Sequence, residues 1–159
     1  MNLFPSRKKF YLIILLISAS SMLSALYIEF ILGYKPCKLC VYQRIPYLGA
    51  IFISFIGFNY YKNDNILIIL IIVFTLSTII SVYHFGIENS FFDEYSSCAN
   101  YTLDVLNKKE LIESLNRNMP VNCKDVTFKM LGISLAAINT ILSILIVIIS
   151  IRTLTYEKN

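Results

Sequence analysis

The sequence is poor in charge, because only 15% of its residues are charged, whereas soluble domains average about 25%. That shortage argues against an ordinary soluble domain. Hydrophobic residues make up 57% of the chain, and its mean hydropathy is +0.66. A protein embedded in a lipid bilayer is therefore the first hypothesis. Its 159 residues are enough for a single membrane domain that covers residues 1–159.

Other absences exclude further classes of protein. The sequence has no Gly-x-Gly-x-x-Gly or Gly-x-x-x-x-Gly-Lys loop, so the patterns that mark dinucleotide and nucleoside triphosphate sites are missing. The net charge of +4 is small and no basic patch accompanies it, so we expect no nucleic-acid partner. No internal repeat or low-complexity linker divides the chain.

Four apolar runs without charged residues predict an all-α fold, an integral membrane four-helix bundle. They cover residues 10–28, 45–61, 66–85 and 130–151. The first run has 19 residues, which at about 1.5 Å per residue match a hydrocarbon core of about 30 Å. A cleaved signal peptide is the alternative for this run, but signal-peptide cores are usually only about 7–15 residues long.

Four spans put both termini on one side of the membrane and two outer loops, residues 29–44 and 86–129, on the other. The N-terminal residues 1–9 carry three cations and no acid, which predicts cytoplasmic termini. All cysteines of the chain then fall in the outer loops, on the oxidising side where disulfides persist. These cysteines are Cys37, Cys40, Cys98 and Cys123.

Three roles are open to the cysteines. A structural disulfide suits Cys98 and Cys123, since it would close a loop of about 26 residues and stabilise the fold by about 3 kcal/mol. It suits Cys37 and Cys40 badly, because a Cys-x-x-Cys bridge constrains almost nothing. A four-thiolate zinc site normally joins two closely spaced couples, so we expect no metal. The third role is thiol–disulfide exchange, in which one pair passes electrons to the other.

The chemistry around Cys40 favours exchange. Cys-x-x-Cys pairs, helix N-termini and nearby arginine all favour the reactive thiolate, and all three apply to Cys40 if a helix begins near residue 41. Arg44 follows four residues later, about one turn, and stays protonated at any working pH. The competing role for Arg44 is an anchor at the membrane interface.

Two further polar residues lie at or inside the predicted spans. His84 is the only histidine and lies near the outer end of the third span, at a depth close to that of Arg44. It is a candidate cofactor-binding residue with Glu88 as a possible partner, although packing at the interface is the common role for such a residue. Asn139 is polar within the fourth span, where we expect it to hydrogen-bond a neighbouring helix.

These residues resemble the disulfide bond formation protein B family, DsbB, of bacterial inner membranes. The resemblance covers nearly the whole chain and rests on four spans, Cys37-Lys38-Leu39-Cys40 before the second span, Arg44, and a cysteine pair in the second outer loop. The segments 83–88 and 132–139 look like the alphaproteobacterial branch. The absence of tryptophan and the presence of Gln43, where some members have an acid, depart from the pattern and leave the docking surface for a partner open.

The resemblance implies a quinone-dependent protein-disulfide oxidoreductase with periplasmic cysteine loops. Cys98–Cys123 would be attacked by a reduced DsbA-like thioredoxin-fold protein of the periplasm, at Cys98 first. Cys123 would then bridge to Cys37 and release Cys40. Cys40 would donate to a quinone, either ubiquinone or menaquinone, beside Arg44 and His84.

Alternatives from other classes stay open. Vitamin K epoxide reductase-like proteins also join a helical bundle to a quinone, but their Cys-x-x-Cys follows the loop cysteines, whereas here it precedes them. Electrons could flow in the reverse direction, to an extracellular partner. The chain could also be a non-catalytic membrane scaffold whose disulfides only stabilise its loops.

Overall fold

The computed structural model describes residues 6–92, 123, 129–130 and 132–156. Within these residues the chain forms four long helices: α1 (Arg7–Phe30), α2 (Lys38–Asn59), α3 (Asp64–Glu88) and α5 (Leu135–Tyr156). A two-stranded antiparallel hairpin, β1 (Lys129–Met130) and β2 (Ile133–Ser134), precedes α5. All four helices are long and apolar enough to cross a membrane, which confirms the predicted all-α membrane bundle.

Side chains at the starts of three helices accept hydrogen bonds from backbone amides that have no partner within the helix. At α2 the sulfur of Cys37 accepts from the Cys40 amide, and at α3 the Asn63 side chain accepts from the Asn65 amide at 3.0 Å. At α5 the Ser134 hydroxyl accepts from the Ala137 amide at 3.2 Å. The first of these caps makes a cysteine of the Cys-x-x-Cys pair part of the helix start.

Helices α2 and α5 begin farthest from the starts of their predicted spans. Helix α2 begins at Lys38 instead of residue 45, so it already includes Cys40 and Arg44. Helix α5 begins at Leu135 instead of residue 130, because Gly132 adopts a φ of +83° and turns the chain between the two strands of the hairpin. A hydropathy run marks only the apolar part of a helix, whereas the hydrogen-bonded helix extends into polar flanks.

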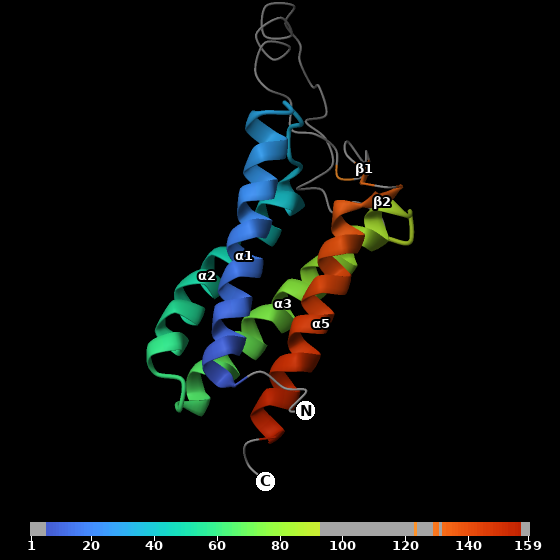
Figure 1. Ribbon diagram of the computed structural model, residues 1–159. Coiled ribbons are helices and arrows are strands. Elements are labelled where there is room, and N and C mark those ends of the chain that lie inside the picture. The colour runs from blue at the N-terminus through green and yellow to red at the C-terminus, as the bar shows by residue number, and fades with distance from the viewer. Residues whose placement is uncertain (1–5, 93–122, 124–128, 131, 157–159) are drawn as a thin grey trace, which may run out of the picture.

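The helices pack so that α1 lies against α2, α2 against α3, and α3 against α5. The start of α1 and the end of α5 lie at one end of the bundle, and the end of α1 and the start of α2 lie at the other (Figure 1). An ion pair between Arg7 and Asp64, at 2.6 Å, joins the starts of α1 and α3 at the first of these ends. The Cys-x-x-Cys pair therefore lies at the end opposite to the helix ends that lead to the termini.

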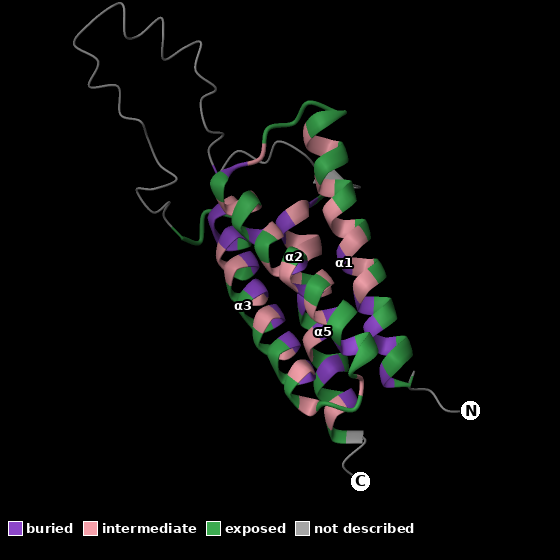
Figure 2. Ribbon diagram, turned by 90° about the vertical axis from the view of Figure 1, so that its left-hand side faces the viewer, coloured by how far each residue is buried: buried purple, intermediate pink, exposed green. Residues whose placement is uncertain are grey.

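The buried core is small, and the outer faces of the helices are apolar. The core groups Phe10, Tyr11 and Ile14 of α1 with Tyr47 of α2 and Phe74 of α3. Exposed residues run along the outer sides of the helices (Figure 2), and many of them are Leu, Ile or Phe. Exposed apolar side chains over whole helices are expected where lipid replaces water around the protein.

Candidate thiol site at the outer end of the bundle

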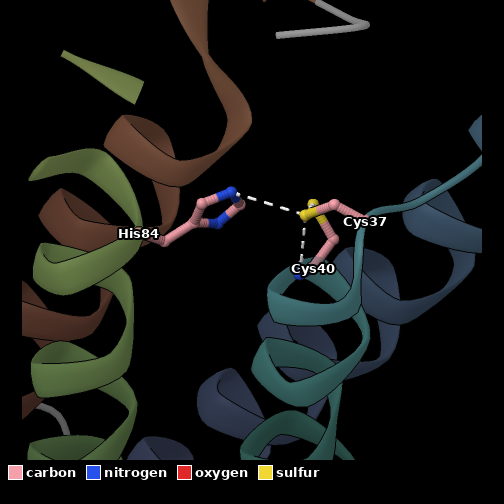
Figure 3. Close-up of side chains that lie close together, drawn as sticks. All are labelled: Cys37, Cys40 and His84. Carbon is pink, nitrogen blue, oxygen red and sulfur yellow. Dashed lines mark hydrogen bonds between the residues drawn. The ribbon is translucent and has the colours of Figure 1, made fainter. Parts of the chain in front are cut away.

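The Cys37 and Cys40 side chains lie side by side at the first turn of α2 (Figure 3). The Cys37 thiol donates a hydrogen bond to the Cys40 sulfur at 2.9 Å, and the Cys37 sulfur accepts from the Cys40 backbone amide at 3.2 Å. Cys40 therefore holds the sulfur that accepts the shared proton. The positive end of the helix dipole and the backbone amide both lie next to this pair, which favours negative charge there.

The third cysteine of the site comes from the second predicted outer loop. Cys123 is buried in one cluster with Cys37 and Ile87, and its thiol hydrogen-bonds to the Cys37 sulfur. The cluster thus joins the two predicted cysteine loops. None of Cys37, Cys40 and Cys123 is in a disulfide, and Cys98 lies outside the described residues.

The proton of Cys37 is held tightly. The hydrogen bond with Cys123 by itself lowers the pKa of the Cys37 thiol, but the hydrogen bond to Cys40 and the burial of the sulfur outweigh it and raise this pKa to about 12. Cys37 is therefore a neutral donor near pH 7. Cys40, which accepts its hydrogen bond, is the residue of the pair that can act as the thiolate. The sequence-based choice of Cys40 as the reactive thiolate stays a prediction.

His84 is buried against the same pair, with a fractional exposure of 2%. Its Nε2 faces the Cys37 sulfur (Figure 3), at a distance of 3.5 Å. The same nitrogen lies 3.7 Å from Glu88 Oε1. On the other side of the ring, Gln43 Nε2 lies 3.1 Å from Nδ1. Because an amide nitrogen can only donate, Nδ1 is the acceptor and the ring proton is on Nε2, facing Cys37 and Glu88.

A cavity of about 340 Å³ opens next to Cys40, between α1, α2 and α5. Arg44 lines it together with Tyr47 and Asn139, and apolar side chains of Met22, Ile28 and Leu142 complete much of its wall. Arg44 forms an ion pair with Glu29, which fixes the cation at the wall. His84 is not among the lining residues, so its predicted role at a cofactor stays a prediction.

Asn139 and Tyr47 meet across the cavity wall, because the Tyr47 hydroxyl donates to Asn139 Oδ1. The expected bond between Asn139 and a neighbouring helix is therefore confirmed. Asn139 Nδ2 is buried and has no hydrogen-bond partner among the described residues. Such an unpaired donor is unusual, since buried polar atoms are nearly always hydrogen-bonded.

The donor atoms of Cys37, Cys40 and His84 also lie within 4.8 Å of one another. Two sulfurs and an imidazole nitrogen are ligands that zinc accepts, so among the described residues this is the group that could hold a metal ion. It differs from the four-thiolate site weighed from the sequence, because Cys98 is not part of it. The expectation of no metal stays a prediction.

Two contacts of the site were beyond sequence analysis. Gln43 was noted only as a departure from a family pattern, yet it orients the imidazole of His84. Tyr47 was not singled out, yet it positions Asn139. The partnership of His84 with Glu88 was foreseen from their spacing of one helical turn.

The fold and the site together define a multi-pass helical membrane protein that holds a dithiol beside a membrane cavity. Its family follows from comparison with known proteins. The chain belongs to the family of disulfide bond formation protein DsbB, whose family model matches residues 7–153. It is therefore a membrane protein of disulfide bond formation and a disulfide oxidoreductase, as the sequence predicts.

Individual relatives agree with this assignment. An uncharacterized protein of Rickettsia prowazekii is 31% identical over 155 residues, which cover 93% of this chain and 88% of that protein. Disulfide bond formation protein B of Marinobacter nauticus is 22% identical over 146 residues, covering 87% of this chain and 86% of its own length. The protein of the same name from Acinetobacter baumannii is 25% identical over 131 residues, with coverage of 77% and 76%.

Proposed function

We propose that the protein oxidises the dithiol of a DsbA-like thioredoxin-fold partner in the periplasm and delivers the electrons to a membrane quinone. The observation that carries this proposal is the contact between Cys37 and Cys123 in one buried cluster. Exchange between two cysteine pairs requires that a sulfur of one pair can reach a sulfur of the other. A scaffold with two independent disulfides has no need for this contact.

The electrons move by disulfide exchange in which every bond formed replaces one broken. A partner thiolate bonds to Cys98 and breaks Cys98–Cys123, and the released Cys123 thiolate bonds to Cys37 and breaks Cys37–Cys40. The second partner thiol closes the partner's own disulfide and releases Cys98, which recaptures Cys123 and frees Cys37. The net result is one disulfide gained by the partner, two electrons held by Cys37 and Cys40, and one proton retained on Cys37.

The residues around the cavity fit a quinone. A volume of about 340 Å³ is within the range of about 300–1,000 Å³ that is usual for ligand sites, and its walls combine apolar side chains with a few polar ones. When bound, a quinone supplies an acceptor for two electrons and two protons. Cys40 offers its sulfur at the wall, and Arg44 places a permanent positive charge where negative charge develops.

His84 and Glu88 lie beside the Cys37 sulfur. His84 Nε2 faces both the Cys37 sulfur and the Glu88 carboxylate, at 3.5 and 3.7 Å. Because the ring proton is on Nε2, this N–H can donate to the Cys37 sulfur and stabilise negative charge there when exchange releases Cys37 as a thiolate. Glu88, at the outer end of α3, faces the same N–H and helps to orient the ring.

The membrane orientation belongs to the same proposal. Both termini face the cytoplasm and the thiol site faces the periplasm of a bacterial inner membrane. The basic residues 7–9 at the start of α1 support this orientation by the positive-inside rule. The ends of α1 and α5 that lead to the termini lie away from the thiol site, as it requires (Figure 1).

Covalent capture of the partner tests the proposal. Oxidised protein is mixed with a thioredoxin-fold partner that retains only its attacking cysteine, and products are separated on non-reducing gels. We expect a reductant-sensitive adduct in the wild type and none in Cys98→Ser, while Thr140→Val, a variant of a span residue outside the cavity lining, behaves as wild type. An adduct that persists in Cys98→Ser would contradict the proposed entry point.

A further inference from the structure

We propose that Asn139 is the group that hydrogen-bonds a carbonyl oxygen of the quinone, and that Tyr47 holds the Asn139 amide in the orientation that makes it a donor. The pair would give the cavity a preference for the oxidised ligand over the reduced one. This inference rests on the proposed function for the identity of the ligand, and it assigns the residues that recognise its oxidation state.

The orientation of the amide follows from the groups around its oxygen. The Tyr47 hydroxyl donates to Asn139 Oδ1, and the Ser143 hydroxyl donates to the same oxygen at 3.4 Å. Ser143 is itself within 3.2 Å of the Ser77 hydroxyl on α3. The amide oxygen therefore accepts hydrogen bonds from a chain of hydroxyls that links α2, α5 and α3. The amide nitrogen has no such partner among the described residues.

That nitrogen is the unusual atom of the Asn139 side chain. Asn139 Nδ2 is buried and lacks a hydrogen-bond partner among the described residues, and Asn139 lines the cavity. Two other polar side chains of the lining have partners, because Gln43 contacts His84 and Arg44 pairs with Glu29. A buried donor without a partner is unfavourable, and a ligand acceptor in the cavity would satisfy it.

The chemistry of the ligand then decides which form binds better. A quinone oxygen is a carbonyl, which only accepts hydrogen bonds. A quinol oxygen carries a proton of its own, and this proton needs an acceptor, whereas the oxygen of the same Asn139 amide is already occupied by Tyr47 and Ser143. The site therefore binds quinone more tightly than quinol. Turnover needs this preference, because quinol must leave before the next quinone binds.

A purely structural role for Asn139 is the competing explanation, since polar residues within membrane helices often join neighbouring helices. The bond from Tyr47 serves that role equally well. The two explanations differ in what the cavity recognises, because a structural bond affects stability and leaves the discrimination between quinone and quinol unchanged.

The test measures binding instead of turnover. Every protein carries both Cys37→Ser and Cys40→Ser, so that no thiol at the cavity wall can react with either ligand. A short-tailed ubiquinone analogue and its quinol are titrated anaerobically by calorimetry in detergent. Asn139→Leu removes the donor at similar size, Tyr47→Phe removes only the hydroxyl, and Thr140→Val is the matched control, since its hydroxyl bonds only to Ala136 of its own helix.

We expect Asn139→Leu to weaken quinone binding about tenfold, which corresponds to about 1.4 kcal/mol, and to change quinol binding less than threefold. Tyr47→Phe should reduce the preference for quinone in the same direction, and Thr140→Val should leave both affinities unchanged. Tyr47→Phe also keeps the inference testable if Asn139→Leu fails to fold.

Quinone affinity and preference that stay within twofold of the parent in folded Asn139→Leu or Tyr47→Phe would overturn the inference and leave Asn139 with the structural role. A different failure is recognisable in the parent protein. If the parent binds neither quinone nor quinol, the proposed function fails first, and the assignment of Asn139 falls with it.

Discussion

The thiol of Cys123 hydrogen-bonds to the sulfur of Cys37, and both side chains are buried in one cluster with Ile87. Cys37 precedes α2, whereas Cys123 belongs to the long segment between α3 and α5. The fold therefore brings sulfurs from two distant parts of the chain into contact at the outer end of the bundle. Cys40 packs against the same cluster and also lies at the wall of the cavity.

The contact predicts a specific disulfide between the two segments. In the double variant Cys40→Ser–Cys98→Ser, only Cys37 and Cys123 remain, and mild oxidation should join them almost quantitatively within minutes. The reason is that their sulfurs already touch, so no rearrangement is needed. Mass spectrometry of tryptic peptides under non-reducing conditions identifies the bond.

The matched control is Cys37→Ser–Cys98→Ser, which leaves Cys40 and Cys123. Its cross-linking should be at least tenfold slower, because Cys37 is the residue whose sulfur hydrogen-bonds to Cys123. Equal cross-linking in the two double variants would show that the segment around Cys123 approaches both cysteines alike and would contradict the assigned order of exchange.

The pKa of Cys37 predicts an unusual pH dependence of alkylation. In the reduced protein this pKa is raised from 9.0 to about 12. Because only the thiolate reacts, the rate of Cys37 alkylation should keep rising between pH 9 and pH 12, where that of an ordinary thiol has levelled off. In Cys40→Ala the hydrogen bond that retains the proton is lost, so the midpoint should move to lower pH. A wild-type midpoint near pH 9, read from peptide mass spectrometry, would refute the proton assignment.

His84 should affect thiol chemistry more than ligand binding. It contacts Cys37 and is not among the residues that line the cavity. Replacing it with alanine removes the N–H that faces the Cys37 sulfur and stabilises negative charge on it, so exchange between Cys37 and Cys123 should slow about 100-fold, while quinone affinity changes less than twofold. Stopped-flow measurement of thiol release separates the two effects. A selective loss of quinone affinity would instead place His84 at the ligand, as the sequence suggests.

Close packing of α1 against α2 depends on one glycine. A Cβ atom at Gly57 would lie 2.4 Å from the ring of Tyr11, which is fully buried and has no room to move. Gly57→Ala should therefore destabilise the protein by about 1–3 kcal/mol. Gly49→Ala on the same helix is the control, because nothing lies within 4 Å of its added carbon. Thermal unfolding in detergent should separate the two variants, and equal midpoints would contradict the packing.

Much of this architecture is predictable from sequence, because a helix that crosses lipid must consist of a long run of uncharged and mainly apolar residues. Long runs without charge predicted all four described helices. Their bounds were harder to predict, since the start of α2 is capped by the sulfur of Cys37, which is not among the residues that usually cap helices. A search for uncharged residues also stops at Arg44, although the helix continues through it.

The site was only partly predictable for a related reason. Spacing along one helix predicts neighbours such as His84 and Glu88, which lie one turn apart. Contacts between helices, such as Tyr47 with Asn139 or Gln43 with His84, depend on how the helices are rotated against each other. This rotation cannot be inferred from the sequence of a single chain.

The central claim is that thiol electrons leave through Cys40 to a quinone. Under anaerobic conditions, purified protein is mixed with a quinone and a reduced DsbA-like partner, and quinone absorbance and partner thiols are followed together. The account predicts that one quinone is reduced for each partner disulfide formed, and that Cys40→Ser abolishes both changes. Persistent partner thiols with unchanged quinone in the wild type would contradict it, as would full activity in Cys40→Ser.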